Sequence, residues 1–181
     1  MSLIRIIINA ALGVAFLACS ANAASKSRFD QEMAKLAAAA SPMKASEIKE
    51  LYAGRTWKWK SGGGFFSAEK TTSALVPSNW NQFAAWSRQG TIWAYAEGNW
   101  YADNNGKLCL HSRWTTKKGG DIAVTCFLHR EKEGVVYQKP SIGGKWYVFS
   151  HNPTQQDDEV LKLVEGDQVS GELERIKATR R

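Results

Sequence analysis

Beyond its N-terminal 23 residues, the sequence lacks an apolar run long enough to cross a membrane, since a spanning helix needs about 20 apolar residues. It contains only three histidines and three cysteines in 181 residues. No serine lies in the Gly-x-Ser-x-Gly motif of α/β-hydrolases. The glycines at 62–64 lack the Lys-Ser/Thr pair of a phosphate-binding loop, and no recognised motif for single-stranded nucleic acid is present. We therefore expect no transmembrane span, no nucleic-acid partner and no cofactor.

The composition is that of an ordinary globular protein. Hydrophobic residues make up 44%, charged residues 23% and aromatic residues 11% of the chain, which excludes disorder of the whole chain. The length fits one domain. The formal net charge of +7 favours anionic partners in general without identifying one.

The N-terminus has the three parts of a secretory signal. Arg5 precedes an apolar run at 6–18, and the run is followed by the small-x-small sequence 21–23. We expect cleavage between Ala23 and Ala24, and a periplasmic or secreted protein. The alternative is a lipoprotein anchored through Cys19, but of the residues just before it only Ala18 fits that signal. The sequence therefore favours soluble export.

Two helices precede a long series of short strands. Apolar residues at helical spacing and an alanine run predict a helix over 28–40. A second helix is expected to begin with Ser46 as N-cap and to end at Gly54, as a lid packed on the following domain. We divide the chain into a signal peptide (1–23), a helical leader (24–45), a β-barrel domain (46–168) and a basic C-terminal tail (169–181), whose end is either frayed or an arm for anionic surfaces.

After Gly54 the hydrophobic period changes from helical to two. Turn signals rich in glycine, asparagine and proline, including Gly62-Gly63-Gly64 and Glu97-Gly98, separate the apolar stretches. Such short connections require antiparallel hairpins. The expected fold is mainly β, an antiparallel up-and-down β-barrel (lipocalin-like) or a barrel-like sandwich with an N-terminal helical segment. The expected strands lie at 56–60, 64–69, 83–87, 91–95, 99–102, 107–114, 122–130, 135–139, 145–150 and 160–164.

Cys109 and Cys126 are the two cysteines of the expected mature chain. If strands 107–114 and 121–130 pair around the loop 115–120, facing residues have numbers that sum to 235, and so do 109 and 126. Facing Cβ atoms lie about 4.5–5.5 Å apart, which allows a disulfide, and export favours one. The alternative is a zinc site that adds His111 and His129, but strand alternation places His129 on the opposite face from Cys126. We expect the disulfide and no metal.

Several segments resemble a bacterial family known only as domain of unknown function 995. The resemblance covers roughly residues 48–149. It implies a small exported protein of a Gram-negative bacterium and supports the disulfide, and it supplies no catalytic residues. The matching segments are 51–59, 62–66, 83–86, 98–100, 106–109, 126–130, 137–138 and 146–147.

The aromatic residues are the most informative functional feature. Each buries about 150–250 Å² when it fills a core, but adjacent pairs such as Trp100-Tyr101 and Trp146-Tyr147 must place one ring on each face of a strand. Some rings therefore point outward or line a cavity mouth, where they can bind a small apolar or glycan-like ligand or another envelope component. The candidate ligand-binding residues are Trp57, Trp59, Phe66, Trp86, Trp100 and Tyr147, with Arg55 and Arg113 as anion contacts.

Two other classes of function stay open. The first is an envelope hydrolase or lyase that acts on polysaccharide or peptidoglycan, which requires a carboxylate near His111 or His129. Ser73, Ser87 and Ser112 are available as nucleophiles, whereas the acidic run 157–159 is typical of a solvated segment. The second is a structural envelope protein without a ligand, which would have a filled interior.

Overall fold

The computed structural model describes the backbone of residues 12–179 and the side chains of residues 25–179. The first part of the expected signal peptide and the last two residues of the basic tail lie outside this range. Cleavage after Ala23 and a lipid on Cys19 therefore stay predictions. Within the described residues, no helix is long and apolar enough to cross a membrane.

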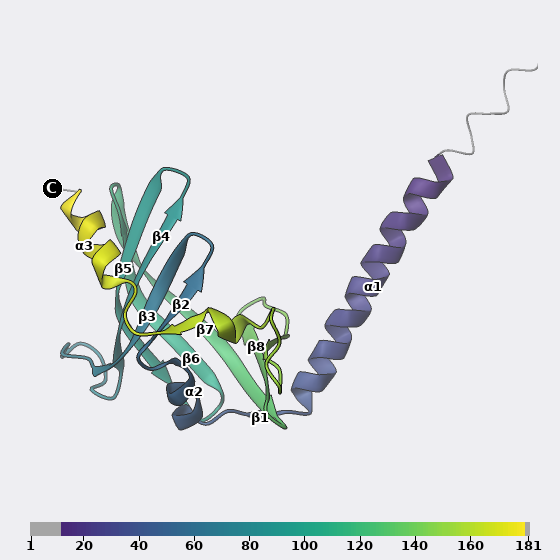
Figure 1. The fold of residues 1–181 in the computed structure, drawn as a ribbon, viewed down its shortest axis with the longest axis horizontal. Helices are drawn as coiled ribbons and strands as arrows, with labels where there is room; N and C mark the ends of the chain where they lie inside the picture. Colours follow the sequence, from purple (N-terminus) through teal and green to yellow (C-terminus); the bar gives the residue numbers. More distant parts are fainter. Residues whose placement is uncertain (1–11, 180–181) are drawn as a thin grey trace, which may run out of the picture.

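The expected helix at 28–40 is the final part of a longer helix, α1 (Leu12–Ala38), which projects away from the sheet (Figure 1). The second helix, α2 (Ala45–Tyr52), begins earlier than Ser46. Its N-cap is Lys44, whose backbone N–H donates to the Glu47 carboxylate at 2.6 Å. Ser46 lies inside the first turn, because the reciprocal bond from Glu47 fixes the start of the helix at Lys44.

The strands form one curled antiparallel sheet, so the predicted fold class is confirmed. β2 to β9 lie side by side in chain order, β10 pairs with the outer edge of β2, and β1 pairs with β7 (Figure 1). Among the described residues no pairing joins β9 to β10, and the short helix η1 (Glu159–Lys162) contacts both β9 and β2. The sheet is therefore a half-barrel with η1 beside its open seam. The strand bounds are β1 (Ser41–Pro42), β2 (Arg55–Trp59), β3 (Gly62–Lys70), β4 (Asn81–Gln89), β5 (Ile92–Ala102), β6 (Lys107–Thr116), β7 (Gly119–Lys132), β8 (Val135–Pro140), β9 (Tyr147–Ser150) and β10 (Leu163–Glu165).

The expected turn at Glu97-Gly98 is wrong, because β5 runs through both residues without a break. Gly98 faces Ser112 of β6. A Cβ on Gly98 would lie 2.2 Å from the backbone oxygen of His111, so this glycine permits a close approach of two strands. Gly62-Gly63-Gly64 likewise lies inside β3 rather than in a turn. The expected strand at 160–164 is divided between η1 and β10.

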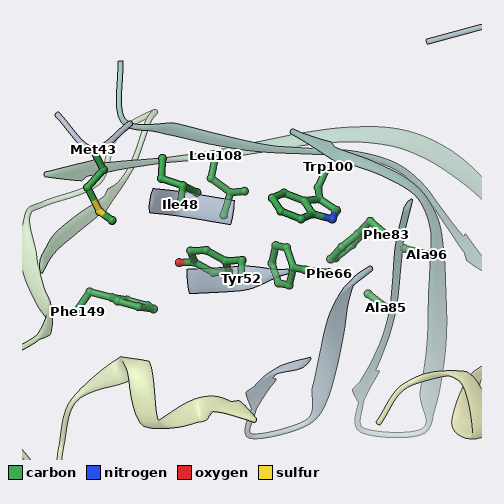
Figure 2. Packing of buried hydrophobic residues seen from close by; sticks show 10 residues of the cluster. All are labelled: Met43, Ile48, Tyr52, Phe66, Phe83, Ala85, Ala96, Trp100, Leu108 and Phe149. Carbon is green, nitrogen blue, oxygen red and sulfur yellow. The ribbon is translucent and has the colours of Figure 1, made fainter. Parts of the chain in front are cut away.

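The core occupies the concave face of the half-barrel. Ile48 and Tyr52 of α2, both 0% exposed, enter it from one end, so α2 covers the sheet as the expected lid. Figure 2 shows Tyr52 beside Phe66, with Trp100 and Phe83 beyond them. The hairpin turns β2–β3, β4–β5 and β6–β7 lie at the other end of the strands, because the chain alternates direction from β2 onward.

Within the described residues, the C-terminal segment 170–178 is helical rather than frayed. Helix α3 (Ser170–Ala178) buries Leu173 and Ile176, which lie three residues apart on one side of the helix. It packs against β4 and β5 on the convex face. Lys177 pairs with Glu97 of β5 at 2.9 Å. These contacts tie the basic C-terminal segment to the domain.

Candidate functional site

The hairpin β6–β7 has the predicted register. Cys109 faces Cys126 and Trp114 faces Asp121. The two cysteines form a disulfide, with Cα atoms 4.1 Å apart. It lies on the convex face, whereas His129 is fully buried on the concave face. The alternation of side chains along β7 thus separates His129 from the other three residues of the zinc alternative. No cluster of three or more potential ligands exists in the described part of the chain.

An aromatic-lined cavity of about 240 Å³ lies on the concave face. We name it the inner cavity. Gly64 of β3 forms part of its wall, and a Cβ there would lie 2.9 Å from the Phe83 ring, so the glycine makes room for that ring. Ser112, Thr125 and Glu159 are its polar lining residues. Its apolar side chains are Trp57, Trp59, Phe66, Phe83, Leu110, Trp114 and Phe127.

A second hollow adjoins the inner cavity at Trp114, toward the hairpin turns. This rim hollow measures about 350 Å³ and is lined by residues of β4, β5 and β6. Trp59 and Ile92 are 38% and 59% exposed at this end of the sheet. Apolar side chains thus extend from the inner cavity toward solvent. The remaining lining residues of the rim hollow are Ser87, Gln89, Ala94 and Thr116.

Three of the candidate residues, Trp57, Trp59 and Phe66, line the inner cavity together. Trp100 points toward the same face but is fully buried, and its indole Nε1 donates to the Ser67 carbonyl at 3.0 Å. It contacts Phe66 edge-on, with ring centroids 5.6 Å apart. Trp100 is therefore a core residue behind the cavity wall.

The other candidates lie elsewhere. Trp86 is on the convex face, where its ring centroid lies 5.6 Å from that of Trp93. Arg113 is also convex, and its guanidinium donates to the Gly120 carbonyl at 2.8 Å. Arg55 donates to the Leu51 carbonyl of α2 at 2.9 Å. The structure thus brings neither arginine to the cavity wall.

A buried polar cluster lies behind the cavity. His129 Nε2 is 2.9 Å from the Tyr52 hydroxyl and 2.6 Å from Gln138 Nε2. Gln138 Nε2 also donates to the Tyr52 hydroxyl at 2.7 Å, and the Tyr147 hydroxyl donates to Gln138 Oε1. The candidate Tyr147 therefore belongs to this cluster. The Tyr52 ring packs on the cavity residue Phe66 with centroids 4.9 Å apart, so the cluster supports the cavity wall.

The cluster is uncharged at neutral pH. Burial lowers the pKa of His129 to about 4, although its hydrogen bond with the Gly106 carbonyl acts in the opposite direction. Burial also raises the pKa of the Tyr52 and Tyr147 hydroxyls, and the Glu159 carboxylate contributes to both shifts. The three titratable groups of this cluster thus stay neutral, as buried groups without counter-ions do.

Glu159 is the charged residue of the cavity wall. Its carboxylate accepts a hydrogen bond from Trp57 Nε1 at 2.9 Å and pairs with Lys162 at 2.5 Å. The expectation of a solvated acidic run at 157–159 is therefore wrong for this residue, which faces the cavity from η1. It is also wrong for Asp158, which is 4% exposed.

Asp158 organises the loop before η1. Its carboxylate accepts from the backbone N–H groups of His151 and Gln155, each at 2.8 Å, and contacts His151 Nδ1 at 2.5 Å. Burial acts to raise the pKa of Asp158, but these hydrogen bonds outweigh it and lower the pKa. His151 thus holds this loop to Asp158 through both its backbone N–H and its ring.

The comparisons with known proteins identify a family but not an activity. No curated protein and no solved structure matches the chain. The profile of the family described as "Protein of unknown function (DUF995)" matches residues 14–169. The match includes the disulfide hairpin, every residue that lines the inner cavity and the polar cluster behind it. The chain therefore belongs to the DUF995 family.

Proposed function

We propose that this protein is an exported, non-catalytic binding protein that holds a small apolar ligand in the inner cavity. The observation that carries the proposal is the cavity itself. Trp57, Trp59 and Phe66, which come from two strands, converge with aromatic rings from β4, β6 and β7 on one hollow. Largely apolar hollows with a few convergent polar groups are the usual form of small-molecule sites.

The lining favours an apolar ligand over a glycan. A sugar ring needs hydrogen-bond partners for several hydroxyl groups, whereas Ser112, Thr125 and Glu159 are the polar residues of the wall. Glu159 already accepts from Trp57 and Lys162. The volume of about 240 Å³ is below the roughly 300–1,000 Å³ of drug-sized sites. The ligand is therefore a single aromatic ring or a short aliphatic chain, which can extend into the rim hollow beyond Trp114.

Export is part of the proposal. The disulfide between Cys109 and Cys126 supports it, because disulfides persist in oxidising compartments and are rare in the cytosol. The signal-like sequence before Ala24 gives the route. The envelope enzyme and the structural protein have less support, since the neighbours of His129 are Tyr52 and Gln138 rather than a carboxylate and the concave face carries an aromatic-lined hollow.

The test is a calorimetric titration with toluene and with 1-octanol, comparing the wild type with Thr125→Phe. Thr125 is exposed and lines the inner cavity, so a phenyl ring there blocks the cavity without removing a core contact. The matched control is Val124→Phe, because Val124 is 58% exposed on the opposite face of β7. We expect Thr125→Phe to raise the Kd at least tenfold and the control to leave it unchanged. Equal affinity in all three proteins, or no binding to the wild type, would reject the proposal.

A further inference from the structure

A third hollow, which shares Ile92 and Thr116 with the rim hollow, lies between α3 and the turns of the β4–β5 and β6–β7 hairpins. Its volume is about 450 Å³. We name it the hairpin groove. We propose that the hairpin groove binds a single anionic amphiphile, an alkyl or acyl chain with a phosphate head. Its lining residues are Thr91, Ile92, Trp93, Thr116, Lys117, Lys118, Arg175, Ile176 and Thr179.

The groove has apolar walls from two parts of the fold. Ile92 and Trp93 come from the start of β5, and Ile176 comes from α3. Ile176 is 3% exposed, whereas Ile92 is 59% exposed. An isoleucine this exposed at the mouth of an apolar groove offers surface that a hydrocarbon chain can cover. The apolar wall thus suits the chain of an amphiphile.

The charged side of the groove is basic. Lys117 and Lys118 stand in the β6–β7 turn, and within the described residues neither has an acidic side chain at ion-pair distance. Arg175 is held in place by Glu172, at 2.9 and 2.5 Å, and lies 4.6 Å from the centroid of the Trp93 ring. Two lysines without an acidic partner therefore line the groove beside a fixed guanidinium.

Charge complementarity selects the head group. Lysine ammonium groups bind phosphate as mobile point charges, and a phosphate can accept hydrogen bonds from both lysines at once. A neutral head group would have no charge attraction to the two lysines, and a cationic head group would be repelled by them. A groove with one apolar wall and one basic edge therefore distinguishes an anionic amphiphile from other molecules with the same chain.

The experiment measures binding of dodecyl phosphate, below its micelle concentration, by isothermal titration calorimetry. Dodecyl maltoside and inorganic phosphate are the two comparison ligands. We expect dodecyl phosphate to bind at least tenfold more tightly than either. We expect the double variant Lys117→Gln/Lys118→Gln to lose at least tenfold of that affinity, and Ile92→Asn to weaken the chain contact. The matched control is Lys60→Gln/Lys132→Gln, which removes the same charge from two other exposed positions and should bind like the wild type.

Three outcomes would overturn the proposal. Equal affinity for dodecyl maltoside would mean that the lysines do not select the head, and equal affinity for inorganic phosphate would mean that the apolar wall is not used. Binding to vesicles of phosphatidylglycerol without binding to dodecyl phosphate would indicate a membrane surface instead. The Thr125→Phe variant separates the two sites, because it blocks the inner cavity and should leave dodecyl phosphate binding at the hairpin groove unchanged.

Discussion

The indole Nε1 of Trp57 donates a hydrogen bond to the Glu159 carboxylate at 2.9 Å. This bond joins β2 to η1, which lies beside the open seam of the half-barrel. Both residues line the inner cavity. The same contact therefore fixes the orientation of an aromatic wall residue and holds the segment that covers the seam.

Replacing Glu159 with alanine should destabilise the protein by about 1–2 kcal/mol, because it leaves a half-buried indole N–H without a partner. The free energy of unfolding in urea measures this loss. Lys162→Gln is the control, since it removes the more exposed partner of the carboxylate, and such surface pairs contribute about 0–1 kcal/mol. If the two variants unfold alike, the Trp57 bond does not hold η1 in place.

The disulfide closes a loop with a sequence separation of 17 residues. Replacing Cys109 and Cys126 together with alanine should lower the free energy of unfolding by about 3 kcal/mol, because the unfolded chain gains the entropy of an open loop. Urea unfolding of the variant, and of the wild type with and without a reductant, measures the effect. The reductant should leave the variant unchanged. Intact protein from its own host should be two hydrogens lighter than the dithiol by mass spectrometry, and finding both thiols free would contradict the bridge.

The register of the β6–β7 hairpin could be predicted to the residue because it depends on local signals. The glycines at 119–120 indicate a turn, and two cysteines at symmetrical positions favour one register. The expected loop 115–120 is too long, because both strands continue to the pair Thr116 and Gly119. The same kind of signal gave a wrong turn at Gly98, because a glycine in a strand sequence indicates either a turn or a close approach of two strands. Only the neighbouring strand, with the His111 carbonyl 2.2 Å from a Cβ at this position, distinguishes the two.

The cavity could be predicted only in part. Trp57 and Trp59 alternate with lysines on one strand, so their shared face could be read from the sequence. The bonds of Tyr52 to His129 and to Gln138 span 77 and 86 residues. They depend on how far the sheet curls around α2, which no local pattern specifies. For the same reason the arginines 55 and 113 could not be assigned to backbone carbonyls in advance.

Acid should destabilise the protein through His129. Its pKa is about 4 in the folded state, against about 6.5 in the unfolded chain. Below pH 6.5 the unfolded state therefore binds a proton that the folded state does not. The stability contributed by the neutral imidazole is complete above pH 6.5 and is lost toward pH 4, by about 3 kcal/mol in total.

Urea unfolding at pH 7, 6, 5 and 4 measures this loss, and His129→Gln is the comparison variant. A glutamine can keep part of the hydrogen bonding with Tyr52 and does not titrate. The free energy of unfolding should therefore fall less steeply between pH 6.5 and pH 5 in the variant than in the wild type. Carboxylates with lowered pKa, such as Asp158, titrate in both proteins and affect both curves at lower pH. Parallel curves from pH 7 to pH 5 would show that His129 is not the group responsible.

Exchanging single tryptophans should separate ligand binding from stability. Trp59 is 38% exposed at the inner cavity, whereas Trp100 is fully buried behind it. Trp100→Ala should cost about 3–5 kcal/mol of stability, as large-to-small changes in a core do. Trp59→Ala should cost less than about 1.5 kcal/mol, because much of its ring already contacts water, yet it should raise the Kd for toluene several-fold. Urea unfolding and calorimetric titration measure the two effects, with the convex Trp86→Ala as the variant expected to keep toluene affinity. If Trp59→Ala instead unfolds the protein like Trp100→Ala and its folded fraction binds toluene normally, the aromatic wall serves packing alone.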